Sequence, residues 1–392
     1  MRKFVAVLLT VACMTYIAAC GGSSSTTSNV TVYDLPAQPL PVVPFLMGGS
    51  IQKTQLSLAN PVTVSPFAGS SAGFNNISTA GNATFNHPIA VTTDGTNLYV
   101  ADYFNNAIRQ INIVSQHVTT LAGNTLGLAG SVDGIGTAAS FNRPSGITTD
   151  GTNLYVTDSF NYTIRKILIS TGAVSTVAGG VGLTGSIDST FGLNARFNVL
   201  SGITTDGASL YVTDSNNTIR RVAISSTAVS TLAGSPGTSG SADGAPATAR
   251  FNLPARITTD GPNLYVTDYG NSTIRKIALA TGAVSTIAGK VGPGGTAGSH
   301  VDSVDSGLNA RFNQPNGIIT DGINLYVTDS YDNMIRKVVL SSGTVYSGPV
   351  STLANNGAAA STSTMGITTD GTGLYFTDFT ADVLSHRIQV LH

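Results

Sequence analysis

Three features of the 392-residue sequence predict an all-β protein, a six-bladed β-propeller of four-stranded antiparallel blades. A Thr-Thr-Asp-Gly pattern or a close variant recurs at intervals of roughly 50–60 residues, which indicates stacked copies of one unit. The 20 acidic residues are all Asp, which favours turns over helix interiors. A segment that resembles the last strand of a unit stands ahead of the first unit. The repeated aspartates are Asp94, Asp150, Asp206, Asp260, Asp321 and Asp370.

One unit, starting at Gly146, divides into four short strands separated by turns and a loop. Asp150-Gly151 and Thr171-Gly172 supply the turns, where Gly can take a positive φ. Apolar runs such as Leu-Tyr-Val suit strands that are covered on both faces by neighbouring blades. The four predicted strands are Gly146–Thr149, Leu154–Thr157, Ile164–Ile169 and Val174–Ala178.

The last unit is one strand short, and the displaced segment supplies it. After three predicted strands the chain stops at His392, whereas Val62–Gly69 repeats the pattern of Ala173–Gly179, the outer strand of a complete unit. We expect Val62–Gly69 to pair with the third strand of the last blade, because this closes the ring and removes an exposed sheet edge. The three strands are Met365–Thr369, Leu374–Thr377 and about Arg387–Leu391.

The first 60 residues are expected to be a leader and a tether. A cationic start is followed by an apolar stretch, Phe4–Ala19, too short for a comfortable membrane span. Ile17-Ala18-Ala19-Cys20 resembles the bacterial lipobox, which implies a signal peptide over 1–19 and a lipid on Cys20. Ordinary cleavage after Ala19 is the alternative. Residues 20–60 are rich in Ser, Thr and Pro and read as a flexible tether, leaving 61–392 for the propeller.

This resemblance implies a location outside the cytoplasm, on a membrane. Because Gly21 is not Asp, the usual sorting rule favours the outer membrane if the host is Gram-negative. The net charge of −1 provides no basic field, which argues against a nucleic-acid partner.

Motifs within the units point to a family. Asp-Gly, Leu-Tyr-Val-x-Asp, Asn and Ile-Arg-Lys, in this order, resemble NHL repeats over about residues 60–392. The connector Asp133-Gly134-x-Gly136-x-x-Ala139-x-Phe141-Asn142-x-Pro144 is similar to those of bacterial NHL proteins. The resemblance implies the propeller fold but not one function, because NHL-type propellers include protein-binding and RNA-binding modules, sensor domains and a lyase. Related six-bladed propellers include lactonases and strictosidine synthase-like enzymes.

Residues that recur in every unit are expected to serve the fold. The Asp that ends each second strand should accept hydrogen bonds within its loop, and the Arg of each third strand should pair with it or with carbonyls. Calcium binding by these loops is the alternative for the aspartates. The connector phenylalanines are expected to plug the space between blades. They are Phe85, Phe141, Phe197, Phe251 and Phe312.

Residues that break the repeat are the candidates for a ligand site at one mouth of the channel. The position after Phe-Asn varies, and three positions later Gly is the rule, but blade four has Arg256. We expect Arg256 to project into or over the channel; the alternative is a structural bond to a connector carbonyl. The candidate ligand mouth is His87, Arg143, Arg256, Gln314 and Asn316.

The loops after the second strands carry aromatic residues that predict a rim around one mouth. Such a rim suits a peptide or a glycan, and packing between neighbouring loops is the alternative. The candidate rim residues are Tyr103, Phe160, Tyr269, Tyr331 and Phe379.

The sequence therefore favours a binding or scaffolding module over an enzyme. The five His residues occupy unrelated positions, and no Glu is present, so no catalytic residue, metal site or cofactor is predicted. The expected partner is a protein, a peptide or a glycan. Two alternatives remain: a propeller enzyme of the lactonase or lyase type, and a ligand-sensing subunit of an envelope complex.

Overall fold

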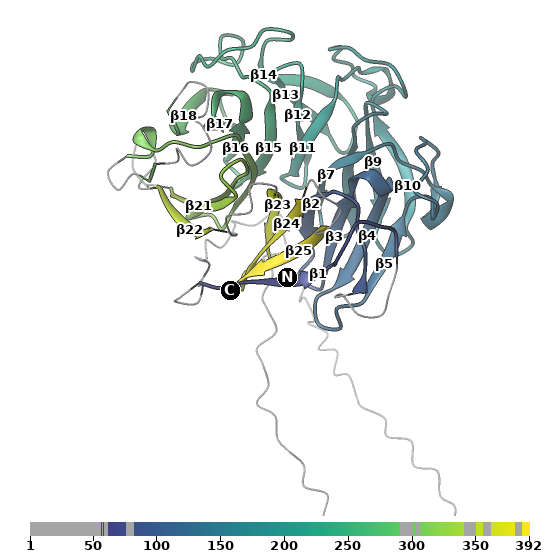
Figure 1. The fold of residues 1–392 in the computed structure, drawn as a ribbon. Coiled ribbons are helices and arrows are strands. Elements are labelled where there is room, and N and C mark those ends of the chain that lie inside the picture. The colour runs from purple at the N-terminus through teal and green to yellow at the C-terminus, as the bar shows by residue number, and fades with distance from the viewer. Residues whose placement is uncertain are drawn as a thin grey trace, which may run out of the picture. The chain divides into compact units, whose positions relative to one another are not determined.

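The computed structural model describes residues 56, 58, 62–75, 82–290, 301–302, 306–340, 350–355, 362–380 and 386–392. The chain divides into Met1–Leu40 and Pro41–His392, and every described residue belongs to the second unit. The predicted signal peptide and almost all of the predicted tether lie outside the described residues. Within Pro41–His392, six antiparallel sheets follow one another around a central channel, which confirms the predicted six-bladed β-propeller (Figure 1).

Each blade begins at the channel with an inner strand and moves outward through three more. The inner strands of blades one to six are β2 (Pro88–Thr93), β7 (Pro144–Thr149), β11 (Leu200–Thr205), β15 (Pro254–Thr259), β19 (Pro315–Thr320) and β23 (Thr362–Thr369). The second strands are β3 (Asn97–Asp102), β8 (Asn153–Asp158), β12 (Ser209–Asp214), β16 (Asn263–Asp268), β20 (Asn324–Asp329) and β24 (Leu374–Thr380).

The outer half of each blade follows the same order. The third strands are β4 (Ala107–Asn112), β9 (Thr163–Leu168), β13 (Thr218–Ala223), β17 (Thr273–Ala278), β21 (Met334–Val339) and β25 (His386–Leu391). The outer strands are β5 (Val118–Ala122), β10 (Ala173–Ala178), β14 (Val229–Gly234), β18 (Val284–Ala288), β22 (Val350–Asn355) and, in blade six, β1 (Val64–Ala68).

The remaining elements lie in connectors and loops. A short strand, β6 (Gly134–Ile135), pairs with β10, so the connector into blade two runs along the outer strand of that blade. The helical elements among the described residues are single 3-10 turns: η2 (Tyr103–Asn105), η3 (Gly136–Ala138), η4 (Gly192–Asn194), η5 (Tyr269–Asn271) and η6 (Gly307–Asn309).

The N-terminal strand completes blade six, as predicted. β1 pairs antiparallel with β25, with Val64 opposite Leu391 and Pro66 opposite Gln389. Figure 1 shows this junction as the purple strand beside the yellow strands. Inner strands β2 and β23 are also in contact, so blade one adjoins blade six and the ring is closed. Leu56, within the segment expected to be a tether, is buried, and its N–H donates to Asp321 Oδ2 at 3.1 Å.

The hydrophobic core lies between the blades rather than within any one of them. Tyr99 and Ile108 of blade one, for example, pack in one cluster with Leu154 and Val156 of blade two. The connector residue Phe141 is fully buried in the same cluster, as predicted for a plug between blades. Because neither sheet face of a blade is covered without its neighbours, the blades stabilise one another around the ring.

In blades two to five, ion pairs of a buried Arg tie the connector to the blade that it enters. Arg165 Nη1 lies 2.7 Å from Asp158 Oδ2 at the end of β8, and its Nη2 lies 2.7 Å from the connector residue Asp133. Asp133 also accepts hydrogen bonds from Thr176 in the outer strand. The predicted pairing of repeated Arg and Asp is therefore confirmed. Equivalent pairs join Arg109–Asp102, Arg220–Asp214, Arg275–Asp268 and Arg336–Asp329.

Threonine side chains of the second strands form hydrogen bonds that link neighbouring inner strands. Thr157 Oγ1 in β8 accepts from Gly146 N–H of its own inner strand at 2.6 Å and donates to Ser201 O of the next at 2.8 Å. Thr213, Thr267 and Thr328 make the same two bonds in blades three to five. Blade one has Ala101 at this position and cannot do so.

Candidate functional site

The four positions that precede Pro at the start of an inner strand share a left-handed backbone. His87, Arg143, Leu253 and Gln314 have φ values of 53°, 56°, 51° and 56°. Non-glycine residues rarely adopt this conformation. In three of them the backbone N–H donates a hydrogen bond to a side chain of the preceding blade. We call the opening that these four residues surround the connector-side mouth. The acceptors are Asn106 Oδ1 for Arg143, Asn217 Oδ1 for Leu253 and His386 Nδ1 for His87, at 2.7–2.9 Å.

Arg143 lies among aromatic rings at this mouth. Its guanidinium carbon lies 4.4 Å from the ring centre of Phe160, 5.4 Å from that of Phe104 and 5.9 Å from that of Tyr103. Cation–π attraction is worth ~0.5–1 kcal/mol at an exposed site, so several rings together fix the position of the charge. Phe104 and Phe160 remain 40% and 37% exposed. The result is a partly exposed aromatic surface with a cation built into it.

His87 extends this cluster toward blade six. Its ring packs edge-on against Phe104 at 4.4 Å and against His386 at 4.7 Å, centre to centre. Burial lowers the pKa of His87 below its usual value. His87 and Arg143 therefore both contact the same phenylalanine, Phe104.

Gln314 belongs to a second, separate group at blades four and five. Tyr269 donates from its hydroxyl to Gln314 Oε1 at 2.8 Å. Burial raises the pKa of Tyr269, and the nearby Tyr331 raises it further. Tyr331 is 61% exposed. The side chain of Phe379 lies outside the described part of the structure, so the predicted rim is described at four of its five positions.

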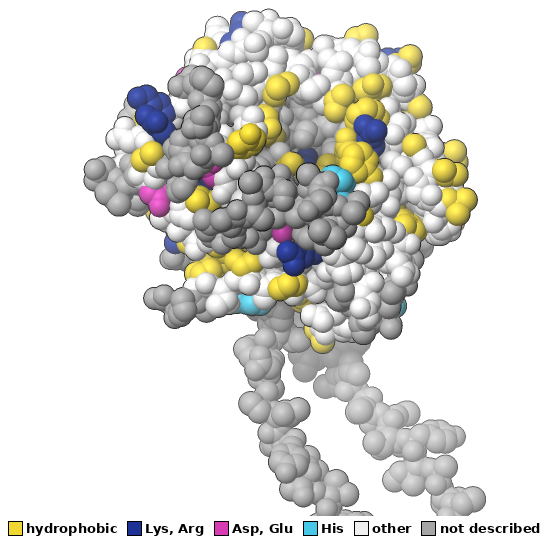
Figure 2. Space-filling view, viewed as in Figure 1, with side chains coloured by type: hydrophobic (Ala, Val, Ile, Leu, Met, Phe, Trp, Pro, Cys, Tyr) yellow, Lys and Arg dark blue, Asp and Glu magenta, His cyan; other side chains and the backbone are white. Residues whose placement is uncertain are grey.

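Exposed apolar residues at the connector-side mouth continue between these two groups. Val199, which precedes β11, is 37% exposed, and Leu253 is 51% exposed. Figure 2 shows hydrophobic side chains, with basic side chains among them, around a hollow in the middle of the face in view. Partly exposed apolar side chains at a concave surface are typical of a binding site.

Arg256 lies inside the channel and not with Arg143 and His87. Its Nη1 donates to Ser201 Oγ of blade three at 3.0 Å, and its Nη2 donates to Ile89 O of blade one at 2.9 Å. The expected projection into the channel is observed, and both of its partners belong to inner strands rather than connectors.

Glycine is the rule at the position of Arg256 because the inner strands approach closely there. A Cβ on Gly202, for instance, would lie 2.7 Å from the Cα of Arg256 in the next blade. Asn316 lies on β19 directly before Gly317, the residue equivalent to Arg256, and so is one residue nearer the connector-side mouth. Its backbone oxygen accepts from Thr267 Oγ1 at 2.6 Å, and its side-chain oxygen is buried without a partner among the described residues.

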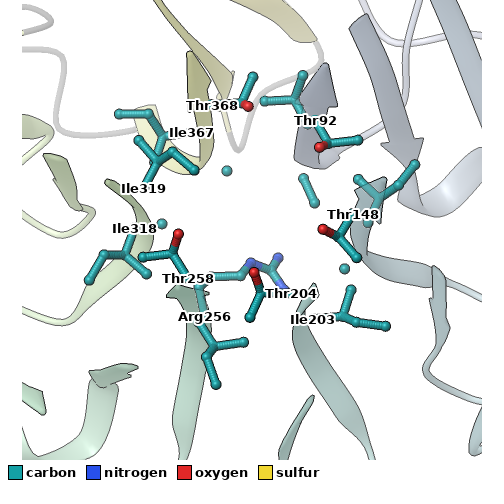
Figure 3. A pocket seen from close by; sticks show the side chains of 17 residues that line it. Thr92, Thr148, Ile203, Thr204, Arg256, Thr258, Ile318, Ile319, Ile367 and Thr368 are labelled. Carbon is teal, nitrogen blue, oxygen red and sulfur yellow. The ribbon is translucent and has the colours of Figure 1, made fainter. Parts of the chain in front are cut away.

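The channel itself contains a cavity of about 70 Å³. Arg256 lines it, together with a ring of Thr hydroxyls that point inward (Figure 3). The sequence alone does not reveal this group, because only the closed ring brings the hydroxyls together. The ring consists of Thr92, Thr148, Thr204, Thr258 and Thr368, and Ile319 takes the sixth position.

The described residues contain neither a metal-binding cluster nor a membrane-spanning helix. No group of three or more His, Cys, Asp or Glu side chains in the described ranges has a geometry that could hold a metal ion. No described segment forms a helix with the length and apolar character needed to cross a bilayer.

Comparison with known proteins identifies the repeats. No family model matches the sequence. The chain is 30% identical over 280 residues to Protein SUPPRESSOR OF QUENCHING 1, chloroplastic, of Arabidopsis thaliana, a match that covers 67% of this chain and 26% of that protein. It is 30% identical over 239 residues to NHL repeat-containing protein 2 of Bos taurus, covering 53% of this chain and 32% of the relative. The chain thus spans about a third of the curated relatives that it matches.

Solved structures share the fold at low sequence identity. A protein of unknown function from Bacteroides thetaiotaomicron has a TM-score of 0.58 at 18% identity, and the match covers 84% of this chain and 75% of that one. An auxiliary nutrient binding protein from Bacteroides ovatus has a TM-score of 0.56 at 15% identity, with 84% and 76% covered.

Six repeated blades around a channel, with residues that vary at one mouth, define a repeat-built β-propeller. The repeat motifs and the relatives that carry them make the chain an NHL-repeat β-propeller.

Proposed function

We propose that this chain is a binding module that holds a protein, peptide or glycan partner at its connector-side mouth. The observation that carries the proposal is the cluster of Phe104, Phe160 and Tyr103 around Arg143. Its aromatic rings are partly exposed and already fixed, so little conformational entropy is lost when a partner covers them. Aromatic and Arg side chains also dominate the energetics of known interfaces.

The comparisons support binding in general terms. The propeller from Bacteroides ovatus that shares this fold is described as an auxiliary nutrient binding protein. Its identity of 15% carries only the fold, so the choice of partner rests on the mouth of this chain. A mixed apolar and cationic surface suits a partner with an apolar group next to an acidic one.

We further propose that the module works outside the cytoplasm, held on a membrane by a lipid on Cys20. The lipobox-like Ile17-Ala18-Ala19-Cys20 supports this, and so does the Ser-, Thr- and Pro-rich segment that follows. Acyl chains contribute ~0.8 kcal/mol per buried CH₂, and two or more chains hold a protein stably on a bilayer. Cys20→Ala should move the protein out of the membrane fraction. Wild-type protein that is soluble and carries no acyl mass on Cys20 would exclude the anchor.

The binding proposal is tested by screening the purified propeller against peptide and glycan arrays. A Phe104→Ala, Phe160→Ala double variant should reduce binding of the best hits at least ~10-fold, because it removes two aromatic contacts of the hot-spot type. Val114→Ala is the matched control, since Val114 is 91% exposed but lies in the turn between β4 and β5.

Equal binding by the double variant and the control would place the partner elsewhere. Turnover of lactone or lyase substrates by the wild-type protein would favour the enzyme alternative. Hits confined to one array would settle whether the partner is a peptide or a glycan.

A further inference from the structure

Arg256 is a buried cation without an acidic partner. It is 9% exposed, and no carboxylate of the described residues forms an ion pair with it. The five arginines buried in the blades differ, since each forms an ion pair with at least one Asp. Burial lowers the pKa of Arg256 to about 10, so it stays charged at neutral pH. A buried charge that is unpaired is costly, and an anion beside it would offset that cost.

The hydrogen bonds of Arg256 leave donors free toward the channel. A guanidinium has five N–H groups, and the bonds to Ser201 Oγ and Ile89 O use one on each terminal nitrogen. One N–H therefore remains on Nη1 and one on Nη2. This pair of donors matches the two oxygens of a carboxylate. Figure 3 shows the guanidinium directed into the middle of the cavity.

The cavity that Arg256 lines offers further polar contacts. None of the five ring threonines makes a side-chain hydrogen bond within the described structure, and their hydroxyls point into the channel (Figure 3). Hydroxyls can donate to an anion as well as accept from water. The remaining lining is apolar and includes Ile203, Ile257 and Ile318.

We propose that the channel is a binding site for a short monocarboxylate of about the size of acetate. Arg256 binds the carboxylate, the hydroxyls of Thr204 and Thr258 donate to its remaining lone pairs, and the isoleucines cover its methyl group. This site is separate from the connector-side mouth and does not depend on the partner proposed there.

Charge and size select this class of ligand. The single cation repels other cations and neutralises one negative charge, so a dianion would remain unpaired. A water needs roughly 10–15 Å³ of cavity, so the 70 Å³ here corresponds to about five to seven waters. An anion of the size of acetate suits that space.

The experiment is a calorimetric titration of the full propeller with sodium acetate and with acetamide, its neutral analogue, at fixed ionic strength. Wild-type protein should bind acetate saturably with 1:1 stoichiometry below about 50 mM and should not bind acetamide. Arg256→Gln should weaken acetate binding at least ~10-fold, because it removes the charge-assisted bonds. The double variant Thr204→Val, Thr258→Val keeps the side-chain shape and should weaken binding ~3–10-fold.

Lys276→Gln is the matched control, because it removes a positive charge from the same blade outside the channel. It should bind acetate like the wild type. Absence of saturable binding, equal binding of acetamide, or unchanged binding in Arg256→Gln would overturn the proposal. If Arg256→Gln fails to fold, the threonine variant decides, and unchanged acetate binding in that variant would also overturn the proposal.

Discussion

At the scale of single residues, the buried arginines Arg165 and Arg256 differ in the groups that they bond to. Arg165 is 1% exposed and bonds to Asp158, to Asp133 and to the carbonyls of Ser140 and Val132. These bonds use all four N–H groups of the two terminal nitrogens and pair the charge with carboxylates. Arg256, by contrast, has only neutral partners among the described residues, and this difference makes it the candidate.

Arg165→Gln should destabilise the protein by roughly 3–5 kcal/mol, because it leaves the buried Asp158 without its cation. The measurement is the free energy of unfolding in urea. Lys166→Gln, at the next position of β9, is the control and should change stability by no more than ~0.5 kcal/mol. A loss below ~1 kcal/mol for Arg165→Gln would show that solvent reaches the pair.

His87 should make stability depend on pH. Because burial lowers its pKa in the folded state, the unfolded state binds a proton more readily, near pH 6.5. Stability should therefore be complete above about pH 6.5 and should fall as the pH drops toward about 5. Melting temperatures at the two ends of this range test the prediction.

His87→Gln is the informative variant, because Gln314 already occupies the equivalent position with nearly the same φ of 56°. It should lose less melting temperature than the wild type on acidification. His117→Gln, which changes an exposed residue, should behave like the wild type. Identical pH dependence in all three proteins would remove His87 as the titrating group.

At the scale of elements, the threonines of the second strands hold neighbouring inner strands together. Thr213 accepts from Gly202 N–H and donates to Ala255 O, both at 2.7 Å. The inner strands need this help because their channel-facing edges have no further strand to pair with. Blade one has Ala101 and lacks this link to the inner strand of blade two. A different link reaches blade one from blade four, where Arg256 donates to Ile89 O.

Thr213→Val should destabilise the protein by ~1–3 kcal/mol, because it leaves a buried N–H and a buried carbonyl unsatisfied. Differential scanning calorimetry would measure the loss. Thr190→Val changes an exposed connector residue and should have little effect. Unchanged stability of the Thr213→Val protein would mean that water replaces the hydroxyl.

At the scale of the whole molecule, stability depends on closure of the ring by β1. The pairing of β1 with β25 is the link between the two ends of the propeller. Without it, blade six would present an open edge that could pair with another chain. In this pairing Val64 lies opposite Leu391, and Gln389 lies opposite Pro66.

Deleting residues 21–69 should open the ring and cause aggregation, whereas deleting 21–55 should not, because it keeps the contact of Leu56 with Asp321. A Val64→Cys, Leu391→Cys pair should form a disulfide, whereas Val64→Cys, Gln389→Cys should not. Light scattering and non-reducing electrophoresis provide the measurements. A monomeric, cooperatively melting 21–69 deletion would show that the ring does not need β1.

The blades could be predicted from the sequence because their signals are local and repeated. Turn residues, apolar runs and the Val-Ser-x-x-Ala-Gly pattern of Val64–Gly69 specify strands and even their order. The Arg–Asp pairs were predictable for the same reason, since each Arg follows its Asp by six or seven residues. Arg256 was found because it breaks this repetition.

What the sequence alone determined is therefore the fold, its closure and the positions that depart from the repeat. Only the tertiary structure decided which of those positions meet: it separates Arg256 from Arg143 and His87, and it joins His87 to His386, 299 residues away. It also converts five scattered threonines into one ring. The physical reason is that strand formation depends on neighbours in the chain, whereas a site depends on distances that exist only once the ring has closed.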